Sequence, residues 1–199
     1  WIPISDEMMN DVPALQSYLD VRLGLGVQIE LDDQLVNGNP AAVPPEVSGF
    51  LLRPGLAAAV PKGAMSNVDA IATQIAAIET AMGTRPDGIV MHPTNWLRII
   101  LSKNGEGLYY GGGPFAQPGA PMLWGLPVAV TSAIAAGTAL VGCFRTFAQL
   151  FRKGGVRVEA SNAHSDYFVR NLIAIRAEIR AALVVYNEAA FGTVTGLDA

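Results

Sequence analysis

Two long stretches of the chain show clear but different hydrophobic periods. In the first, from residue 14 to residue 36, apolar residues recur about every four positions, which predicts a long helix. Pro13 suits its first turn and Asn37-Gly38 its C-terminal cap. We interpret Gly24 and Gly26 as places of close packing rather than as a hinge. The apolar stripe consists of Leu15, Leu19, Leu23, Val27, Leu31 and Leu35, widened by Tyr18, Leu25 and Ile29.

The second stretch alternates strictly between apolar and other residues. Every odd position from Ile173 to Val185 is aliphatic, and the charges Arg176, Glu178 and Arg180 fall between them. A helix would spread these charges around its circumference, so the pattern predicts one long strand at about 171–186. The charged row is then either a solvated face with ion pairs along it or a surface that meets a neighbouring subunit.

A second helix is expected after Ser66, with Asp69 three residues on and Gly83 at its end. Residues 40–63 are rich in proline and small residues, and we interpret them as a loop. Further along, the patterns predict a helix from Pro93 and short strands at 89–91, 126–131, 139–144 and 156–161.

The order of these elements predicts an α+β fold in two parts. Residues 85–152, with mixed α/β character and a glycine- and proline-rich loop at 108–121, form an insertion between residues 1–84 and 153–199. The long helix and the long strand, which flank the insertion in sequence, are expected to run side by side.

Composition limits the classes of function. The 199 residues are 51% hydrophobic and only 15% charged, so either a partner covers part of the surface or the core is large. A net charge of −4 argues against a tight electrostatic grip on nucleic acid, although not against loose containment. The single cysteine excludes an internal disulfide and fits a reducing compartment. We expect no membrane span and no signal peptide, and we interpret Trp1 as an internal residue of a longer product.

The residues that most often carry chemistry do not form a recognisable site. His92 precedes Pro93 and is best explained as a helix-start residue, and Cys143 lies in a strand pattern as a small buried hydrophobe. His164 has only Asp166 near it in sequence. We therefore expect no catalytic residue, no metal and no cofactor. Tyr109 and Tyr110, beside a run of glycines, are either an interface anchor or packed locally on their own lobe.

Several segments, taken in order, resemble one protein family. Residues 3–39, "GIVMHPTNW" (88–96), "LSKNGEGLYYGGGP" (101–114), "LWGLPVAVT" (123–131), "ALVGCF" (139–144) and "NLIAIRAEIR" (171–180) are similar to segments of tailed-bacteriophage major capsid proteins of the Hong Kong ninety-seven type. The resemblance covers nearly the whole chain. It implies a peripheral domain, made of residues 1–84 and 153–199, with a spine helix and a long strand. It also implies an axial domain at 85–152, whose loop around 104–121 points to the capsomer axis.

The resemblance also implies a function and partners. Such coat proteins form hexamers and pentamers that close into an icosahedral shell around double-stranded DNA, in the virion and, during assembly, in the host cytoplasm. A scaffold and a maturation protease are candidate partners. The N-terminal arm and extended hairpin of the family do not match any part of this chain. The alternatives are an encapsulin-like nanocompartment shell and, from another class, a soluble enzyme that uses His92 or Cys143.

Some members of the family join neighbouring subunits by a Lys–Asn isopeptide bond that a Glu assists. Asn171 and Glu178 match the family positions of the Asn and the Glu, and the matching lysine would lie in the extended hairpin. Seven residues apart on a strand, the two would be roughly 23 Å apart and on opposite faces. A shared site would therefore have to form between subunits.

The chain departs from the family at Asn187-Glu188, where Arg-Pro is frequent.

Overall fold

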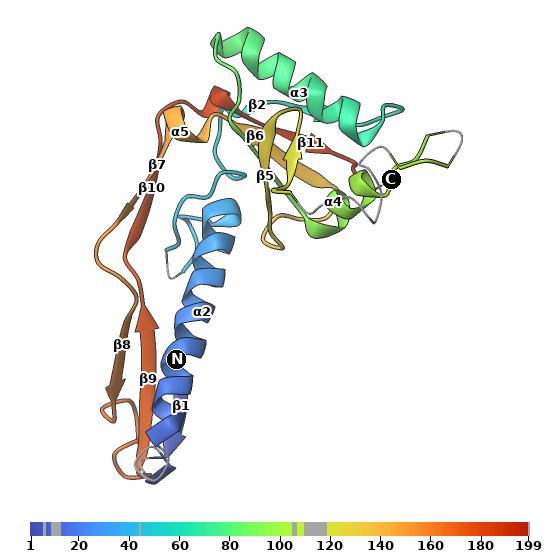
Figure 1. Cartoon of the computed structure of the whole chain (residues 1–199). Coiled ribbons are helices and arrows are strands. Elements are labelled where there is room, and N and C mark those ends of the chain that lie inside the picture. The colour runs from blue at the N-terminus through green and yellow to red at the C-terminus, as the bar shows by residue number, and fades with distance from the viewer. Residues whose placement is uncertain (6, 9–12, 44, 105–106, 110–118, 199) are drawn as a thin grey trace.

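A computed structural model describes residues 1–5, 7–8, 13–43, 45–104, 107–109 and 119–198, without the side chains of residues 13–16. The chain forms a compact head and an elongated arm (Figure 1). The arm contains β1 (Ile2–Ser5), α2 (Pro13–Asn37), β7 (Ala148–Arg152), β8 (Arg157–Ser161), β9 (Leu172–Glu178) and β10 (Ala181–Val185). The head contains β2 (Ala57–Pro61), α3 (Asn67–Met82), β3 (Gly88–Met91), α4 (Pro93–Ile100), β4 (Met122–Leu123), β5 (Leu126–Val130), β6 (Thr138–Gly142) and β11 (Phe191–Thr195).

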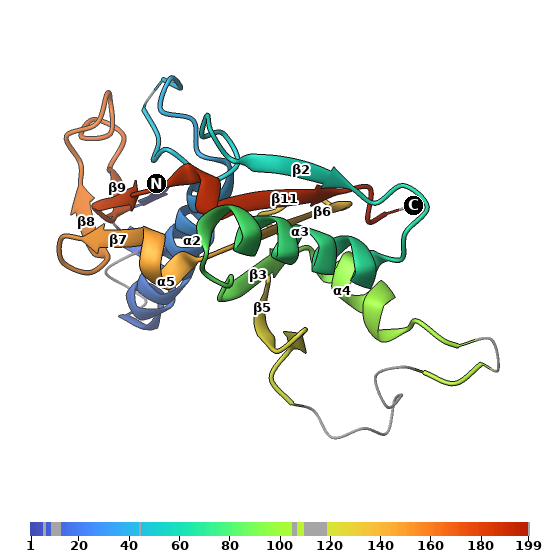
Figure 2. The ribbon, with the colours of Figure 1, turned by 90° about the horizontal axis from the view of Figure 1, so that it is seen from above.

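The head is built on a six-stranded sheet in the order β2-β11-β6-β3-β5-β4. β11 lies in its interior, parallel to β2 and antiparallel to β6. Helix α3 packs along β2, β11 and β6 (Figure 2). The core between helix and sheet is largely aliphatic, and its fully buried residues include Ile71, Ile78, Ile89, Leu140 and Val194.

Local sequence signals explain how both head helices begin. Ser66 caps α3, because its hydroxyl accepts a hydrogen bond from the Asp69 amide at 3.1 Å and donates one to the Asp69 carboxylate at 2.7 Å. Gly83 ends the same helix in the left-handed conformation, at φ 65°. Pro93 occupies the first turn of α4, as predicted. The predicted helices and the strands at 89–91, 126–131, 139–144 and 156–161 are therefore confirmed, with small shifts at their ends.

The expected division of the chain does not match this sheet. Three elements of the head lie outside residues 85–152. They are β2 and α3, whose residues fall in the part at 1–84, and β11, whose residues fall in the part at 153–199. β7, whose residues fall within 85–152, pairs with β10 in the arm.

The interpretation of residues 40–63 as loop was wrong for β2. Its sequence, AAAVP, does not alternate, and it is fixed by parallel pairing with a strand more than a hundred residues away.

The predicted long helix is confirmed as α2, but its outer face corrects the prediction. Leu19 and Leu31 are buried against the strands, whereas Tyr18, Leu25 and Ile29, which were expected to widen that stripe, are exposed. At 100° per residue these three residues lie about 80–160° around the helix axis from the buried ones. The helix therefore has two apolar stripes, of which only one is covered by the described chain.

The packing expected at the two helix glycines is also absent. A Cβ placed on Gly24 or Gly26 would meet no atom of the described chain within 4 Å. These glycines therefore weaken the helix without a compensating contact inside the described monomer.

The long strand expected at 171–186 is two strands, β9 and β10, with a break at Ile179 and Arg180. The cause is a change of partner: β9 lies between β1 and β8, and β10 pairs with β7. β7 and β8 are separated by a turn in which Gly154 has φ 79°. At the break the Lys153 amide donates a hydrogen bond to the Arg180 carbonyl at 3.0 Å.

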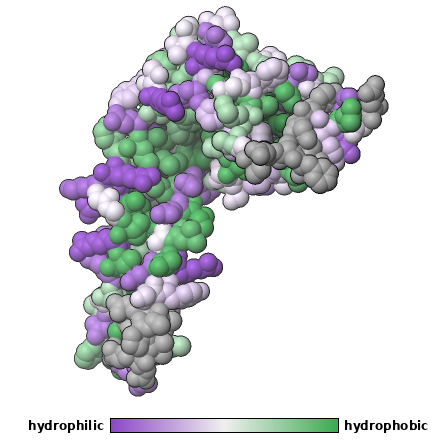
Figure 3. Space-filling model, viewed as in Figure 1, coloured by the Kyte–Doolittle hydropathy of each residue, from purple (hydrophilic) through white to green (hydrophobic). Residues whose placement is uncertain are grey.

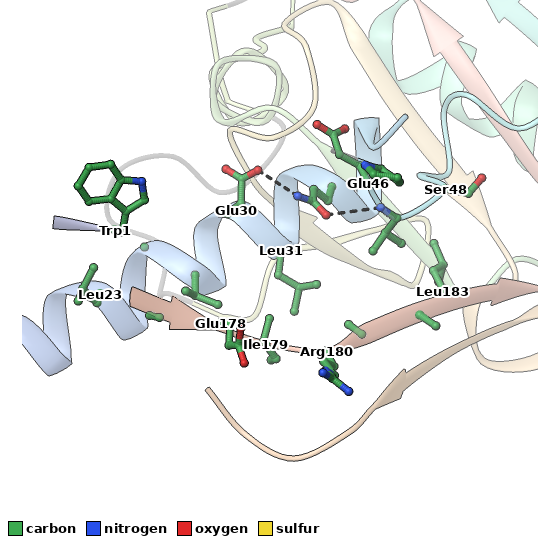
Figure 4. Close-up of a pocket in the computed structure, with 18 of the residues that line it drawn as sticks. Trp1, Leu23, Glu30, Leu31, Glu46, Ser48, Glu178, Ile179, Arg180 and Leu183 are labelled. Carbon is green, nitrogen blue, oxygen red and sulfur yellow. Dashed lines mark hydrogen bonds between the residues drawn. The ribbon is translucent and has the colours of Figure 1, made fainter. Parts of the chain in front are cut away.

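The predicted alternation nevertheless continues through this break. Odd positions such as Ile175 and Ile179 face α2, while Arg176, Arg180 and Val184 are exposed on the other side. Figure 4 shows Leu31 of α2 and Ile179 pointing towards each other, and Glu178 and Arg180 pointing away from the helix. The arm is thus a two-layer slab, with α2 on one face of the strands.

An aromatic cluster lies where the arm joins the head. Phe50, Phe144 and Phe191 pack with ring centroids 5.0 to 5.4 Å apart. Phe191 is fully buried, and its ring lies directly over Gly142. Any side chain at position 142 would overlap this ring.

Gly142→Ala is expected to lower the free energy of unfolding by about 1–3 kcal/mol, because the buried Phe191 ring must move to admit a methyl group. Gly24→Ala is the matched control. Its methyl group meets open space and improves helix propensity, so stability rises by roughly 0.5–1 kcal/mol. Urea unfolding of the unassembled protein measures both effects. Equal changes in the two variants would contradict this packing.

Candidate subunit interface

The outer strand face carries a network of charges within one chain. β8 and β9 pair with Arg157 opposite Glu178 and Glu159 opposite Arg176. The Arg176 guanidinium lies 2.9 Å from a Glu159 carboxylate oxygen and 3.3 Å from one of Glu178. Arg157 pairs with the other oxygen of Glu159. Two of the three predicted charges, Arg176 and Glu178, are therefore paired along a half-exposed face that carries no net charge.

Arg180, the third charge of the row, lies outside the strands and outside this network. Among the described residues no carboxylate lies within ion-pair distance of its guanidinium, and the same holds for the Lys153 ammonium. Both residues line a depression of about 430 Å³ beside the β7–β8 turn. A positive charge is therefore left uncompensated beside the neutral network.

A larger groove lies between the two layers of the arm, with a volume of about 900 Å³ (Figure 4). Its walls come from α2, from residues 45–48 and from residues 177–183. The first two walls are joined by a hydrogen bond from the Val47 amide to the Gln34 side-chain carbonyl at 3.5 Å. The Gln34 amide also donates to Glu30 within α2, at 3.2 Å. The lining is mixed in polarity and contains no arrangement typical of catalysis.

The structure describes only one residue of the predicted tyrosine pair. Tyr109 is half-buried and pairs with Lys103, whose ammonium lies 4.5 Å from the centre of the tyrosine ring. This contact is local packing, which was one of the two alternatives. Tyr110 lies outside the described residues.

Asn171 and Glu178 lie at opposite ends of β9. Asn171 comes immediately before the strand, in a left-handed conformation at φ 54°, and Glu178 is the last strand residue. Asn171 also lines a depression of about 400 Å³ together with Tyr167 and Phe168. The two residues are not brought together within one chain.

The three residues weighed for chemistry lie apart and have structural partners. His92 caps α4, because its Nδ1 accepts from the Thr94 amide at 3.2 Å. His164 packs against the rings of Trp1 and Tyr167, with ring planes inclined by 54° and 85° and centroid distances of 5.3 and 5.1 Å. Cys143 is buried, and burial together with the nearby Asp87 carboxylate raises the pKa of its thiol.

In the described part of the chain, no three His, Cys, Asp or Glu side chains gather closely enough to hold a metal ion. No described helix has the length and apolar character needed to cross a membrane.

Sequence reasoning missed two exposed apolar surfaces on the arm. On α2, the exposed fractions are 63% for Tyr18, 75% for Val21, 46% for Leu25 and 59% for Ile29. On the β7–β10 ribbon they are 49% for Phe151, 36% for Val184 and 60% for Tyr186. The signal for the second surface was present in the alternation, since Val184 and Tyr186 continue the even-numbered row that begins with Arg176.

The profile of the phage capsid family matches residues 1–196 of this chain. The chain belongs to the phage capsid family. The major capsid protein of Enterobacteria phage HK97 is 35% identical over 191 residues, which are 96% of this chain and 49% of that protein. The chain thus spans about half the length of this curated relative.

Solved structures share the fold over nearly the whole chain. A structure described as the capsid of an empty GTA particle, computed with C5 symmetry, aligns with a TM-score of 0.76 and 16% identity, covering 98% of this chain and 70% of that one. A structure from Gordonia phage Cozz aligns with a TM-score of 0.73 and 14% identity, covering 98% and 67%. The family profile and the 35% identical relative confirm the predicted phage capsid family, and these solved structures share the fold of the head and arm.

Cys143 is expected to resist thiol reagents in the folded protein, because its thiol is buried and its raised pKa keeps it protonated near neutral pH. Ellman's reagent at pH 8 should react with the thiol only after unfolding in urea. Rapid reaction with the native protein would revive the soluble-enzyme alternative.

Glu159→Gln is expected to lower the free energy of unfolding by less than about 1 kcal/mol, because exposed ion pairs contribute little. The difference should shrink at about 1 M salt, where charges are screened within roughly 3 Å. Glu79→Gln, at an exposed acid of α3, is the control for the loss of one negative charge. A loss of about 2 kcal/mol or more would show that the network is a structural ion cluster.

Proposed function

We propose that this chain is the shell-forming part of a major capsid protein of a tailed bacteriophage or prophage. The observation that carries the proposal is the family match over residues 1–196 together with a head-and-arm fold shared with capsid structures. Its role is structural rather than enzymatic, in the capsid of the virion. The buried thiol and the structural histidines support this role, because none of them is placed for chemistry.

In this proposal the arm is the peripheral domain and α2 is its spine helix, while the head is the axial domain. The pairing of strands supports limits for the axial domain that differ from the expected residues 85–152. The axial part runs from about residue 50 to 147 and resumes at about 187, because β11 completes its sheet. Residues 101–104 and 107–109, which follow α4, project away from the sheet (Figure 2) and would point to the capsomer axis.

The assembly that we propose is a closed shell made of hexamers and pentamers. Two of the structural relatives are described as GTA-particle capsids computed with C5 symmetry, which fits five-fold capsomers. The net charge of −4 favours loose containment of DNA over tight binding. A scaffold, a maturation protease and assembly in the host cytoplasm remain expectations from the family.

An inter-subunit isopeptide bond at Asn171, assisted by Glu178, is a further expectation. Their separation along β9 means that any such site would need a second chain. The encapsulin-like alternative is less well supported, because the family profile and the curated relative are both phage capsid proteins.

The complete gene product that contains this chain should assemble into uniform closed particles. Negative-stain microscopy and light scattering of the purified protein test this, with co-expression of the neighbouring phage genes to supply any scaffold or protease. The 199-residue chain alone provides the comparison. Failure of the complete product to assemble, even with those genes, would contradict the proposal.

A further inference from the structure

The turn between β7 and β8 is a bulge in the strand layer of the arm. Lys153 lies opposite Arg180, because its amide donates to the Arg180 carbonyl and so continues the register of β7 and β10. β8 takes up its pairing with β9 only at Arg157. Residues 154–156 therefore have only Ile179 opposite them, and their backbone lies outside the ladder. Bulges of this kind redirect the neighbouring side chains.

The bulge is flanked by a cross-strand pair of like charge. Lys153 and Arg180 are both exposed, and no carboxylate among the described residues lies within ion-pair distance of either. Like charges directly opposite each other destabilise a sheet. The free subunit therefore carries a local repulsion that its own described residues do not offset.

These two cations line the depression of about 430 Å³, which we call the bulge site. Arg157 and Glu178 also line it, but the Glu178 carboxylate already pairs with Arg176 at 3.3 Å. The amides of Gly154 and Gly155 make no hydrogen bond to another described residue, and a Cβ on either glycine would meet no described atom within 4 Å. Open backbone amides beside cations, in a turn with a left-handed residue, are typical of anion-binding concavities.

The surroundings favour a single anionic group over a polyanion. Hydrophilic residues project along the β7–β8 edge of the arm (Figure 3), but they include Glu159 and Glu178, which would repel a second phosphate group. Nucleic acid would need a continuous basic stripe, and the net charge of the chain is −4.

A carboxylate has the chemistry that the bulge site needs. It accepts charge-assisted hydrogen bonds from guanidinium and ammonium groups and from backbone amides. The chain itself is a source of such groups, because its 17 Asp and Glu residues outnumber its 13 Lys and Arg residues. Another subunit could therefore supply the acid that the site lacks.

We infer that the bulge site binds a carboxylate side chain of a second copy of this chain. The bound carboxylate would offset the repulsion between Lys153 and Arg180, so the pair destabilises the free subunit and stabilises the contact between subunits. This inference rests on the proposed function and names one polar contact that would hold neighbouring subunits in register.

Removing both cations from the complete gene product separates this role from a structural one. The Lys153→Gln/Arg180→Gln variant should melt roughly 1–3 °C higher than wild type as an unassembled subunit, because the like-charge repulsion is gone. Its assembled fraction in sedimentation velocity should nevertheless fall about tenfold, because the incoming carboxylate loses its cations. Arg145→Gln/Arg152→Gln is the matched control. It removes two exposed arginines that do not line the bulge site, so assembly should stay within about twofold of wild type.

Carbodiimide cross-linking of the wild-type protein identifies the partner, because the reagent joins an amine only to a carboxylate in direct contact with it. Particles are assembled from a mixture of isotopically light and heavy subunits. Mass spectrometry should then find Lys153 joined to an Asp or Glu peptide of the other isotope. Unassembled subunits should not give this product, since no described carboxylate lies within ion-pair distance of Lys153.

A light–heavy product at Lys153, together with weaker assembly of a more heat-stable double variant, supports the inference. It is overturned if that variant assembles as well as its control or melts below wild type. It is also overturned if assembled particles give no Lys153 product, or if the acid comes from the same chain or from a scaffold. The proposed function survives all of these results, because wild-type particles still form. If wild type never assembles, the proposed function fails and this inference fails with it.

Discussion

The packing of Phe191 over Gly142 holds the two parts of this chain together. Phe191 begins β11, which lies inside the head sheet, and Gly142 ends β6 beside it. The chain enters the arm directly after this point, through α5 (Phe144–Phe147) into β7, and returns directly before it, from β10 through the short helix η1 (Glu188–Ala190). The two arm strands, β7 and β10, are therefore anchored to the buried core of the head at this point.

The arm depends on one-sided burial. Its strands turn their aliphatic residues towards α2 and leave the opposite side to charges and to a few apolar side chains. A slab of two layers has no third layer to cover its outer surfaces, so both remain exposed in the single chain. For a monomeric protein such apolar exposure would be a liability. In the shell-forming role proposed above, these exposed apolar surfaces would supply contacts between subunits.

The sequence predicted the elements whose signals are local and missed those that depend on distant pairing. The structure contains the predicted long helix, the Ser66 cap and the alternation of side chains from Ile173 to Val185. β2 and β11 carried no local signal, because each is a strand only through its neighbour across the sheet, and this moved the domain limits. The break at Arg180 could not be foreseen, since alternation reports the face of a side chain and not the partner of its backbone. Likewise, periodicity showed that Ile29 belongs to an apolar helix, but not which of the two apolar stripes of α2 would pack against the strands.

Hydroxyl-radical footprinting of the complete gene product, before and after assembly, tests the central claim that the arm surfaces exist for contact between subunits. The account predicts that oxidation of Tyr18, Phe151 and Tyr186 falls on assembly, while the head residue Trp124, which is also exposed, keeps its reactivity. Unchanged oxidation of all three arm residues in fully assembled particles would contradict it.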